Sequence, residues 1–320
     1  MAYAQGDLIL KDHYNTFSTG TAAGTADNNV ANINTVWGVG NGNKGYGQST
    51  VLTPVTTGSV VTATQWSTLI SRLNSILTHQ AGAGSGVTSP VAGDLIAYLS
   101  TLSGKVTDAY NNRLNFNSTR GTPSTTNYDA VWTSATPTTF QQVRTVTFVD
   151  SDSARYFFNA GGRIGISLSI PTGGTDNSKE TSWAALLTGG VGTLSLDALT
   201  STRSAAGYTP LTTDGSSIGF WDLTDADQTL IKVTDSVVAY NTNYVEVLCK
   251  ATGTLGSNGG KGTTLTFTIN YNDAATDSSG TGNFFDDISM TMRAAVTITP
   301  PESTNISNTW GTVTPAATVN

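Results

Sequence analysis

Long stretches in the second half of the chain alternate apolar and polar residues with a period of two. The clearest span residues 163–170, 264–271 and 288–298. Because successive side chains of a strand point to opposite faces, each predicts a strand with one apolar face on a core. Shorter candidates lie at residues 142–149, 154–159, 192–196, 217–222, 228–233 and 243–251. About nine short strands with polar turns between them predict an antiparallel β-sandwich or jelly roll over residues 140–299, with one short helix in "ETSWAALL" laid across it.

Before these strands, the sequence predicts a helical region over residues 61–116. Thr62 and Gln65 have the spacing of a capping box, in which the hydroxyl and the amide satisfy free N–H groups at a helix start. Trp66 then begins an apolar stripe on one helical face, and the stripe continues to Leu77. The apolar stripe stops before the glycine-rich stretch "GAGSG", which predicts the end of the helix.

A second helix is predicted after Ser89 and Pro90, which suit a helix start. Apolar residues then recur at intervals of four and three, among them Leu99, Leu102 and Val106. This spacing keeps one seam facing a partner helix. The two helices are predicted to form an antiparallel hairpin. Their stripes pack either on each other or around a threefold axis with copies of the chain.

The remaining segments have no periodic pattern. Residues 1–60 are rich in Gly, Thr and Asn and predict an extended arm, residues 117–139 a linker, and residues 300–320 a polar tail. Trp37 and Trp310 are the tryptophans of the arm and the tail. Trp310 either folds back on its own domain or docks on another subunit, and we predict that both tryptophans contact other chains.

The stretch "NINTVWGVGNGNKGYGQ" contains the spacing G-x-G-x-x-G at Gly40, Gly42 and Gly45. A dinucleotide-binding loop must enter a helix whose N-terminus meets the pyrophosphate. Here "YGQSTVLTPVTTG" follows, which has no helical period, so phosphate binding is not predicted. "GSNGGKG" around Lys261 also lacks the Ser or Thr of a P-loop. The glycines are predicted to serve turns and close backbone approach instead.

Few residues could carry chemistry. The two histidines, His13 and His79, and the single Cys249 give no zinc-binding spacing. Cys249 is predicted to be a core thiol, and His79 to end the first helix, where a partly positive ring suits the dipole. Aspartates could form a catalytic pair or hold calcium, but aspartate is common at turns because it bonds its own backbone. They stand at 150, 152, 222, 225, 227, 286 and 287. No enzyme activity, cofactor or metal site is predicted.

Charge and hydropathy narrow the class of partner. Charged residues make up 12% of the chain, the net charge is −7, and no cluster of Lys or Arg exists, so nucleic-acid binding is not predicted. The N-terminus lacks the basic head and apolar run of a signal peptide, so none is predicted. The sequence contains no apolar run of 18 residues, so no membrane-spanning helix is predicted. A polar but nearly uncharged surface suits a β-rich protein that meets other subunits.

The combination of "NINTVWGVGNGNKGYGQ", "VVTATQWSTLISRLNSI", "ARYFFNAGGRIGISLSI", "WDLTDADQTLIKV" and "YNTNYVEVLCKA" resembles virion structural proteins of tailed bacteriophages. The likeness is greatest to phages of cyanobacteria and other aquatic bacteria. It implies a non-enzymatic component of the tail, baseplate, collar or fibre apparatus, assembled in the host cytoplasm. The implied partners are other virion proteins and copies of the chain, as a trimer.

Within this reading, Trp37, Trp66, Leu99, Leu102, Val106 and Trp310 are the candidates for contacts between subunits. Three alternatives stay open. A head decoration protein would differ in copy number, and a host-glycan-binding adhesin module would use surface aromatics such as Trp132, Trp183 and Trp221. A polysaccharide-degrading spike would use the aspartates, but no β-helix repeat supports it.

Overall fold

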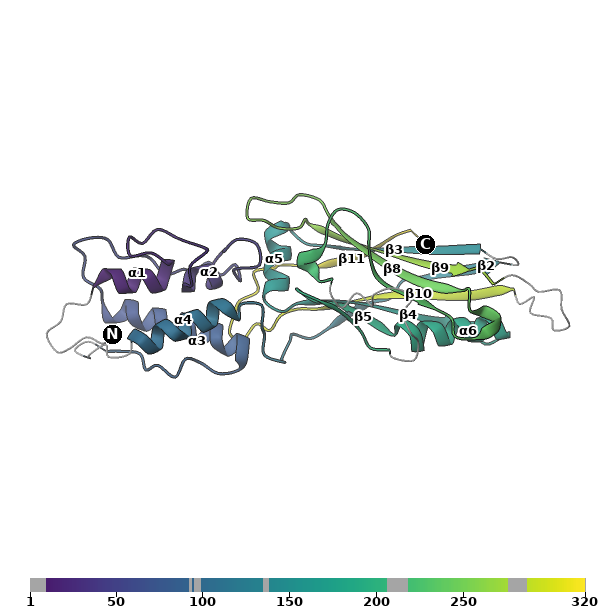
Figure 1. Ribbon diagram of the computed structural model, residues 1–320, viewed down its shortest axis with the longest axis horizontal. Helices are drawn as coiled ribbons and strands as arrows, with labels where there is room; N and C mark the ends of the chain where they lie inside the picture. Colours follow the sequence, from purple (N-terminus) through teal and green to yellow (C-terminus); the bar gives the residue numbers. More distant parts are fainter. Residues whose placement is uncertain are drawn as a thin grey trace.

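The computed structural model of the chain describes residues 10–91, 94, 99–134, 138–205, 218–275 and 287–319. The molecule is elongated, with helices α1 to α4 at one end and two antiparallel sheets at the other (Figure 1). Helix α5 (Ser151–Asn159) lies between the two parts, and α6 (Ser178–Ala185) lies at the far end of the sheets. Mixed helix and antiparallel sheet is therefore the fold class.

The helical end contains α1 (Lys11–Thr19), α2 (Ile33–Trp37), α3 (Ala63–Ala81) and α4 (Leu99–Asn111). The capping box of α3 is confirmed: the Gln65 backbone N–H donates to Thr62 Oγ1 over 3.2 Å, and the Thr62 N–H donates to Gln65 Oε1 over 2.8 Å. Helix α4 packs against α3, and α2 packs against both.

The prediction of an extended arm is wrong for residues 10–60. Tyr14 and Phe17 of α1 place their rings 5.8 Å and 6.1 Å from the ring of Trp66 on α3, and Ile33 and Val36 of α2 are buried. The apolar stripe of α3 needs a cover, and these sparse apolar residues supply it from the same chain. Residues 1–9 lie outside the described residues.

Within the described residues, eleven strands form the two sheets. The first sheet has the order β1 (Ser124–Thr126), β10 (Ile288–Thr299), β4 (Arg163–Thr172), β5 (Thr193–Leu196) and β6 (Ser201–Arg203), and β2 (Asp129–Ser134) also pairs with β10. The second has the order β11 (Thr314–Val319), β3 (Thr138–Thr147), β9 (Thr264–Asp273), β8 (Tyr244–Thr252) and β7 (Gln228–Thr234). Every pairing is antiparallel, from β10 with β4 to β3 with β9.

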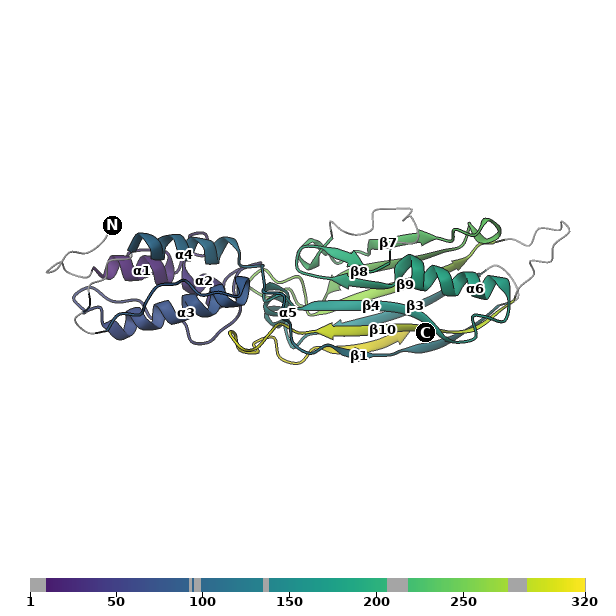
Figure 2. The same cartoon turned by 90° about the horizontal axis from the view of Figure 1, so that it is seen from below.

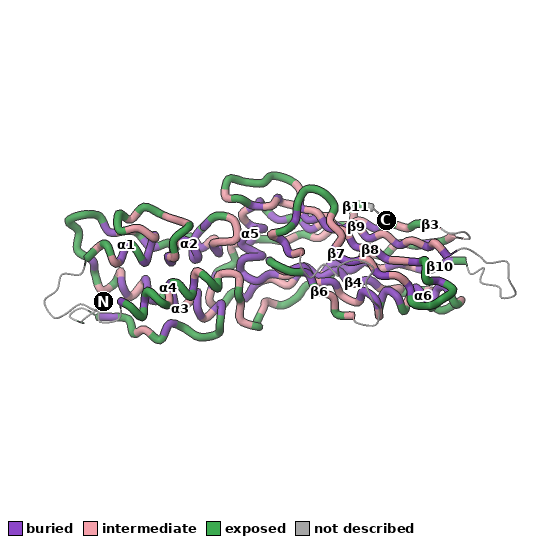
Figure 3. Tube along the Cα trace, in the orientation of Figure 1, coloured by how far each residue is buried: buried purple, intermediate pink, exposed green. Residues whose placement is uncertain are grey.

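The two sheets face each other across an apolar core (Figures 1 and 3). Alternate residues of β9 and β8 are buried, as the period of two predicts. Two side chains of β3 reach β10 in the other sheet: Gln142 Nε2 donates to the carbonyl of Met292 over 3.1 Å, and Arg144 Nε donates to that of Ala294 over 3.4 Å. This two-layer packing agrees with the predicted sandwich, whereas the jelly-roll topology stays a prediction.

Several local predictions are corrected. Residues 154–159 belong to helix α5 because Asp150 caps it, its carboxylate accepting the Ser153 N–H over 2.6 Å. Of 217–222, residues 220–222 form a 3-10 turn and residue 217 lies outside the described residues. The predicted linker contains β1 and β2, and the predicted tail contains β11. The short helix in "ETSWAALL" is confirmed as α6, with a π-helical turn (Leu186–Val191) after it.

Candidate functional site

The glycine-rich loop of residues 38–48 meets helix α5 where the helical end joins the sheets. The guanidinium of Arg155 donates to the carbonyls of Gly42 at 2.9 Å, Lys44 at 3.1 Å and Val39 at 3.1 Å, and to Asp152 Oδ1 at 2.9 Å. The Arg155 side chain is fully buried. A phosphate-binding loop aims N–H donors at its ligand, whereas this loop aims carbonyl oxygens at a cation. The loop therefore holds an internal arginine.

Glycine is required in this loop for close approach. Gly45 has φ +88, and a Cβ there would overlap the carbonyl of Val39. Gly47 has φ +71, and a Cβ there would overlap the ring of Tyr156 on α5. Both φ values lie in the left-handed region that only glycine adopts without strain. The predicted structural role of these glycines is confirmed.

A second loop and a further side chain complete the contact. The Gly42 N–H donates to the carbonyl of Asn258 over 2.8 Å, and the Asn258 amide donates to Asp152 Oδ2 over 2.8 Å. Asn159 of α5 donates to the carbonyl of Gly45 over 3.1 Å. The two glycine-rich stretches of the sequence thus meet each other beside α5. We call residues 38–48, α5 and the chain segment 302–310 the junction.

The C-terminal segment forms the other side of the junction. His79 Nδ1 lies 2.8 Å from Glu302 Oε1, in a pair whose side chains are almost fully buried. Gln48 Nε2 donates to the carbonyl of Ser307 over 2.9 Å, and the Ser307 N–H donates back to Gln48 Oε1 over 3.0 Å. Each bond joins the helical end to residues that follow the last strand of the first sheet. The helical end and the sheets are therefore fixed to each other by buried polar contacts from three separate stretches of the chain.

Burial determines the charge of the His79 ring. Burial lowers the pKa of His79 below its ordinary value of 6.5, and the hydrogen bond and charge of Glu302 and the backbone of Ala160 oppose this effect without overcoming it. Burial alone would raise the pKa of Glu302, but hydrogen bonds from His79, Asn305 and Thr304 outweigh it, so that pKa is lowered. A neutral ring beside a carboxylate replaces the partly positive ring that the sequence predicts.

We expect the fold to lose stability in mild acid through His79. Because its folded pKa lies below 6.5, its contribution is fully present above pH 6.5 and is lost as the pH falls through the folded pKa. Urea unfolding at about pH 7.5 and about pH 5.5 measures this loss in the wild type and in His79→Gln. Glutamine can still donate to Glu302 and does not titrate, so the variant should lose less. Equal losses would contradict the assignment.

The six candidates for contacts between subunits are buried within their own chain. Exposed fractions are 5% for Trp37, 0% for Trp66, 5% for Leu99, 0% for Leu102, 2% for Val106 and 3% for Trp310. The three apolar residues of α4 and Trp66 of α3 join one intrachain core with α1 and α2. Almost no surface of these side chains is left for a second subunit. Their predicted role between chains is corrected to a role in the core.

Arg155 is a residue of the junction that the sequence analysis did not single out as a site residue. It stands in "SARYFFNAGG", where one arginine interrupts an apolar run in a chain with 15 basic residues. A cation in such a run needs a set of buried acceptors. Asp152, three residues before Arg155, is one acceptor. The three carbonyl acceptors come from residues 39–44, more than a hundred positions away, and the sequence does not show that these residues meet Arg155.

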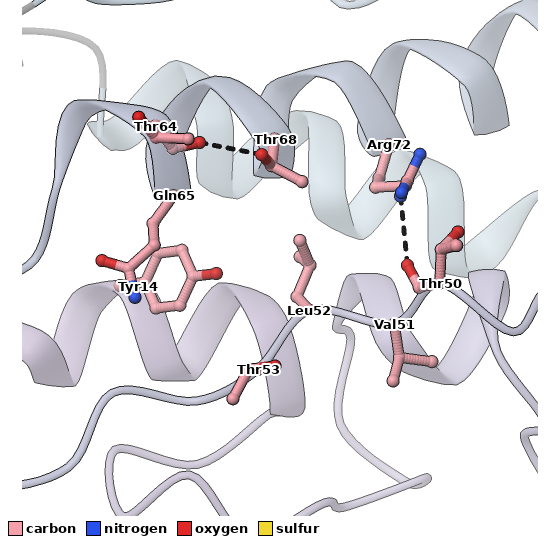
Figure 4. Close-up of a pocket in the computed structure, with 9 residues that line it drawn as sticks. All are labelled: Tyr14, Thr50, Val51, Leu52, Thr53, Thr64, Gln65, Thr68 and Arg72. Atoms are coloured by element: carbon pink, nitrogen blue, oxygen red, sulfur yellow. Dashed lines mark hydrogen bonds between the residues drawn. The ribbon is translucent and has the colours of Figure 1, made fainter.

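A shallow pocket lies beside α3 (Figure 4). It is lined by Tyr14, Thr50, Val51, Leu52, Thr53, Thr64, Gln65, Thr68 and Arg72. Arg72 Nε donates to the carbonyl of Thr50 over 3.1 Å, and its guanidinium lies 5.0 Å from the Trp37 ring centre. The lining offers hydroxyl and amide groups but no carboxylate, thiol or imidazole, so it has no acid–base pair of its own.

Four of the aspartates proposed for chemistry hold local structure. Asp150 caps α5, Asp152 pairs with Arg155, Asp222 accepts the Gly219 N–H over 2.9 Å, and Asp227 lies 3.2 Å from Lys250 Nζ. Within the described ranges, no group of three or more His, Cys, Asp or Glu side chains is placed to bind a metal ion. Asp286 lies outside those ranges.

Cys249 is fully buried, and burial raises the pKa of its thiol, as predicted for a core cysteine.

None of the helices in the described part of the chain combines the length and apolar character needed to span a bilayer. Comparison of the chain with protein-family models, with curated proteins and with solved structures found no match. The contacts of its own residues are therefore the basis for a functional proposal.

Proposed function

We propose that the chain is a non-enzymatic structural subunit of a tailed-phage particle, in the tail, baseplate, collar or fibre apparatus. The sequence resemblance suggests the class of particle. The observation that carries a structural role is the junction, where a fully buried Arg155 and the buried His79–Glu302 pair lock an elongated molecule along its length. A part that transmits force or sets spacing needs such a lock between its ends.

Assembly with copies of the chain, as a trimer, is proposed to use surfaces other than the buried stripes. In the described part of the chain, β11 and β7 each pair with one strand only and form the edges of the second sheet. Edge strands carry backbone donors and acceptors that another chain can pair with. The proposal also includes two features of the fold that stay predictions. They are a jelly-roll order of the strands and an antiparallel hairpin formed by α3 and α4.

The host-glycan alternative gains no support from the aromatic residues that suggested it. Trp132 and Trp183 are buried and pack with their rings 5.2 Å apart. Trp221 is half-buried, and its Nε1 donates to Asn159 at the junction over 3.1 Å. A sugar-stacking platform needs an exposed ring face, so these side chains serve the fold instead.

Quantitative mass spectrometry of purified particles from the encoding phage tests this function. We expect peptides of the chain in the particles at low copy number, as for a tail component, and a trimer when the purified chain is weighed by mass photometry. A high copy number would favour the alternative that the chain is a head decoration protein. Its absence from particles, while the infected cells contain it, would contradict the proposal.

A further inference from the structure

Lys179 and Asp273 form a buried ion pair at the far end of the sheets from the helices. Lys179 Nζ lies 3.2 Å from Asp273 Oδ2, and the two side chains are 4% and 1% exposed. Lys179 stands in the first turn of α6, and Asp273 is the last residue of β9. Both elements are labelled in Figure 2. In a chain with so few charges, a buried ammonium and carboxylate in contact require an explanation, because burial penalises both ions.

Aromatic residues stand close to this pair along α6 and β9. Trp183 is four residues after Lys179 on the same helical face, and Tyr271 is two residues before Asp273 on the same strand face. The Trp183 ring lies 6.3 Å from the Tyr271 ring and 5.2 Å from the Trp132 ring.

Helix α6 is held rigidly beside β9. Glu180 Oε1 accepts the Ser289 N–H over 2.8 Å, and its Oε2 accepts the Gly174 N–H over 3.1 Å. Ser182 Oγ donates to Asp235 Oδ2 over 2.5 Å. The two residues Glu180 and Ser182, which follow Lys179, thus tie α6 to β10 and to the segments that follow β4 and β7. These bonds hold the helix in the position from which Lys179 reaches Asp273.

The backbone after Asp273 is fixed in the same way. Asn243 Oδ1 accepts the N–H groups of Ala274 and Ala275, both over 2.8 Å. Asn243 itself pairs with Asp235, whose N–H donates to its carbonyl over 2.9 Å. The amine and the carboxyl group are therefore presented to each other by two anchored segments, and such fixed proximity accelerates a reaction between them.

We propose that Lys179 and Asp273 condense to an intramolecular isopeptide bond between α6 and the end of β9. One proton passes from the ammonium to the carboxylate, and the lone pair of Nζ attacks Cγ, which lies one bond from the hydrogen-bonded Oδ2. The C–O bond to the protonated oxygen breaks, the nitrogen loses a second proton, and one water leaves. Ammonium plus carboxylate equals amide plus water, so no oxidant or other reactant is needed.

The bond has a defined mechanical consequence. Helix α6 follows β4 of the first sheet, whereas β9 belongs to the second sheet. The amide would join the two sheets covalently and close a loop between residues 94 positions apart. Shear that pulls one sheet past the other would then load a covalent bond as well as the apolar core.

Intact-mass spectrometry of the denatured, purified full chain tests the proposal. The wild type is expected to be lighter than its sequence mass by one water, and a tryptic digest to contain a peptide that joins Lys179 to Asp273, with no cleavage after Lys179. Lys179→Arg keeps the charge but has no primary amine, and Asp273→Ala has no carboxyl carbon. Both should have the full sequence mass.

The Lys250–Asp227 pair provides a matched control. Its Nζ–Oδ1 distance is also 3.2 Å, but its side chains are 31% and 41% exposed, and Lys250→Arg should keep the missing water. A wild type of full sequence mass with trypsin cleavage after Lys179 would overturn the proposal, even if the variants did not fold. A missing water that persists in Lys179→Arg would also overturn it.

Discussion

A chain that ends at Thr299 is expected to lose its native fold. The removed segment supplies β11 to the edge of the second sheet, where it pairs with β3. It also supplies the buried side chains of Ile306 and Trp310 and the carboxylate that faces His79. Losing two large buried side chains costs more than about 5 kcal/mol, which is comparable to the whole stability of many domains.

Urea unfolding followed by tryptophan fluorescence measures this loss. The point variant Trp310→Ala, which keeps the strand, is expected to lose about 3 kcal/mol or more. Val60→Ala is the control, because that side chain is 81% exposed and its removal should change stability by less than about 0.5 kcal/mol. A truncated chain with the wild-type midpoint would instead assign the segment to contacts with other chains.

Replacing Arg155 by methionine is expected to destabilise the chain by about 3–5 kcal/mol, the cost typical of removing one partner of a buried pair. Methionine fills similar space but removes the hydrogen bonds of the guanidinium to the carbonyls of Val39, Gly42 and Lys44. Only the longer bonds from Asn159, 3.3 Å each, remain at the last two carbonyls. Urea unfolding with an unchanged m-value would show the loss as a lower midpoint.

Arg293→Met is the matched control for this substitution. Arg293 makes an equally short pair with Asp129, with Nε 2.7 Å from Oδ1, but both side chains lie at the surface. Surface pairs contribute little because water screens them. The midpoint of this variant should stay close to that of the wild type. Equal destabilisation by the two substitutions would mean that the glycine-rich loop does not depend on Arg155.

The parts of the fold that local pattern determines were predictable from the sequence. The runs at 163–170, 264–271 and 288–298 became β4, β9 and β10, because period-two alternation survives in any sheet with one buried face. The capping box at Thr62 fixed the start of α3. The run at 154–159 was misread as a strand because a short apolar run fits either element, and Asp150 decides in favour of a helix.

The burial of the candidate site residues could not be predicted, because their partners are distant in the sequence. Trp66 is covered by Tyr14 and Phe17 from a segment that has too few apolar residues to suggest a helix. Arg155 meets carbonyls more than a hundred residues earlier, and Lys179 meets a carboxylate 94 residues later. A sequence pattern shows that one face of a helix or strand must be covered. It does not show which distant residues cover that face in the folded chain.

Spin–spin distance measurement between the two ends of the molecule tests the locked junction directly. Labels at Ser71→Cys on α3 and Thr139→Cys on β3, both exposed positions, in a Cys249→Ala background, span the junction. One narrow distance distribution that broadens in Arg155→Met is the result expected of a single rigid body. A broad distribution in the unmodified junction, unchanged by that substitution, would mean that the ends move independently and would contradict the account.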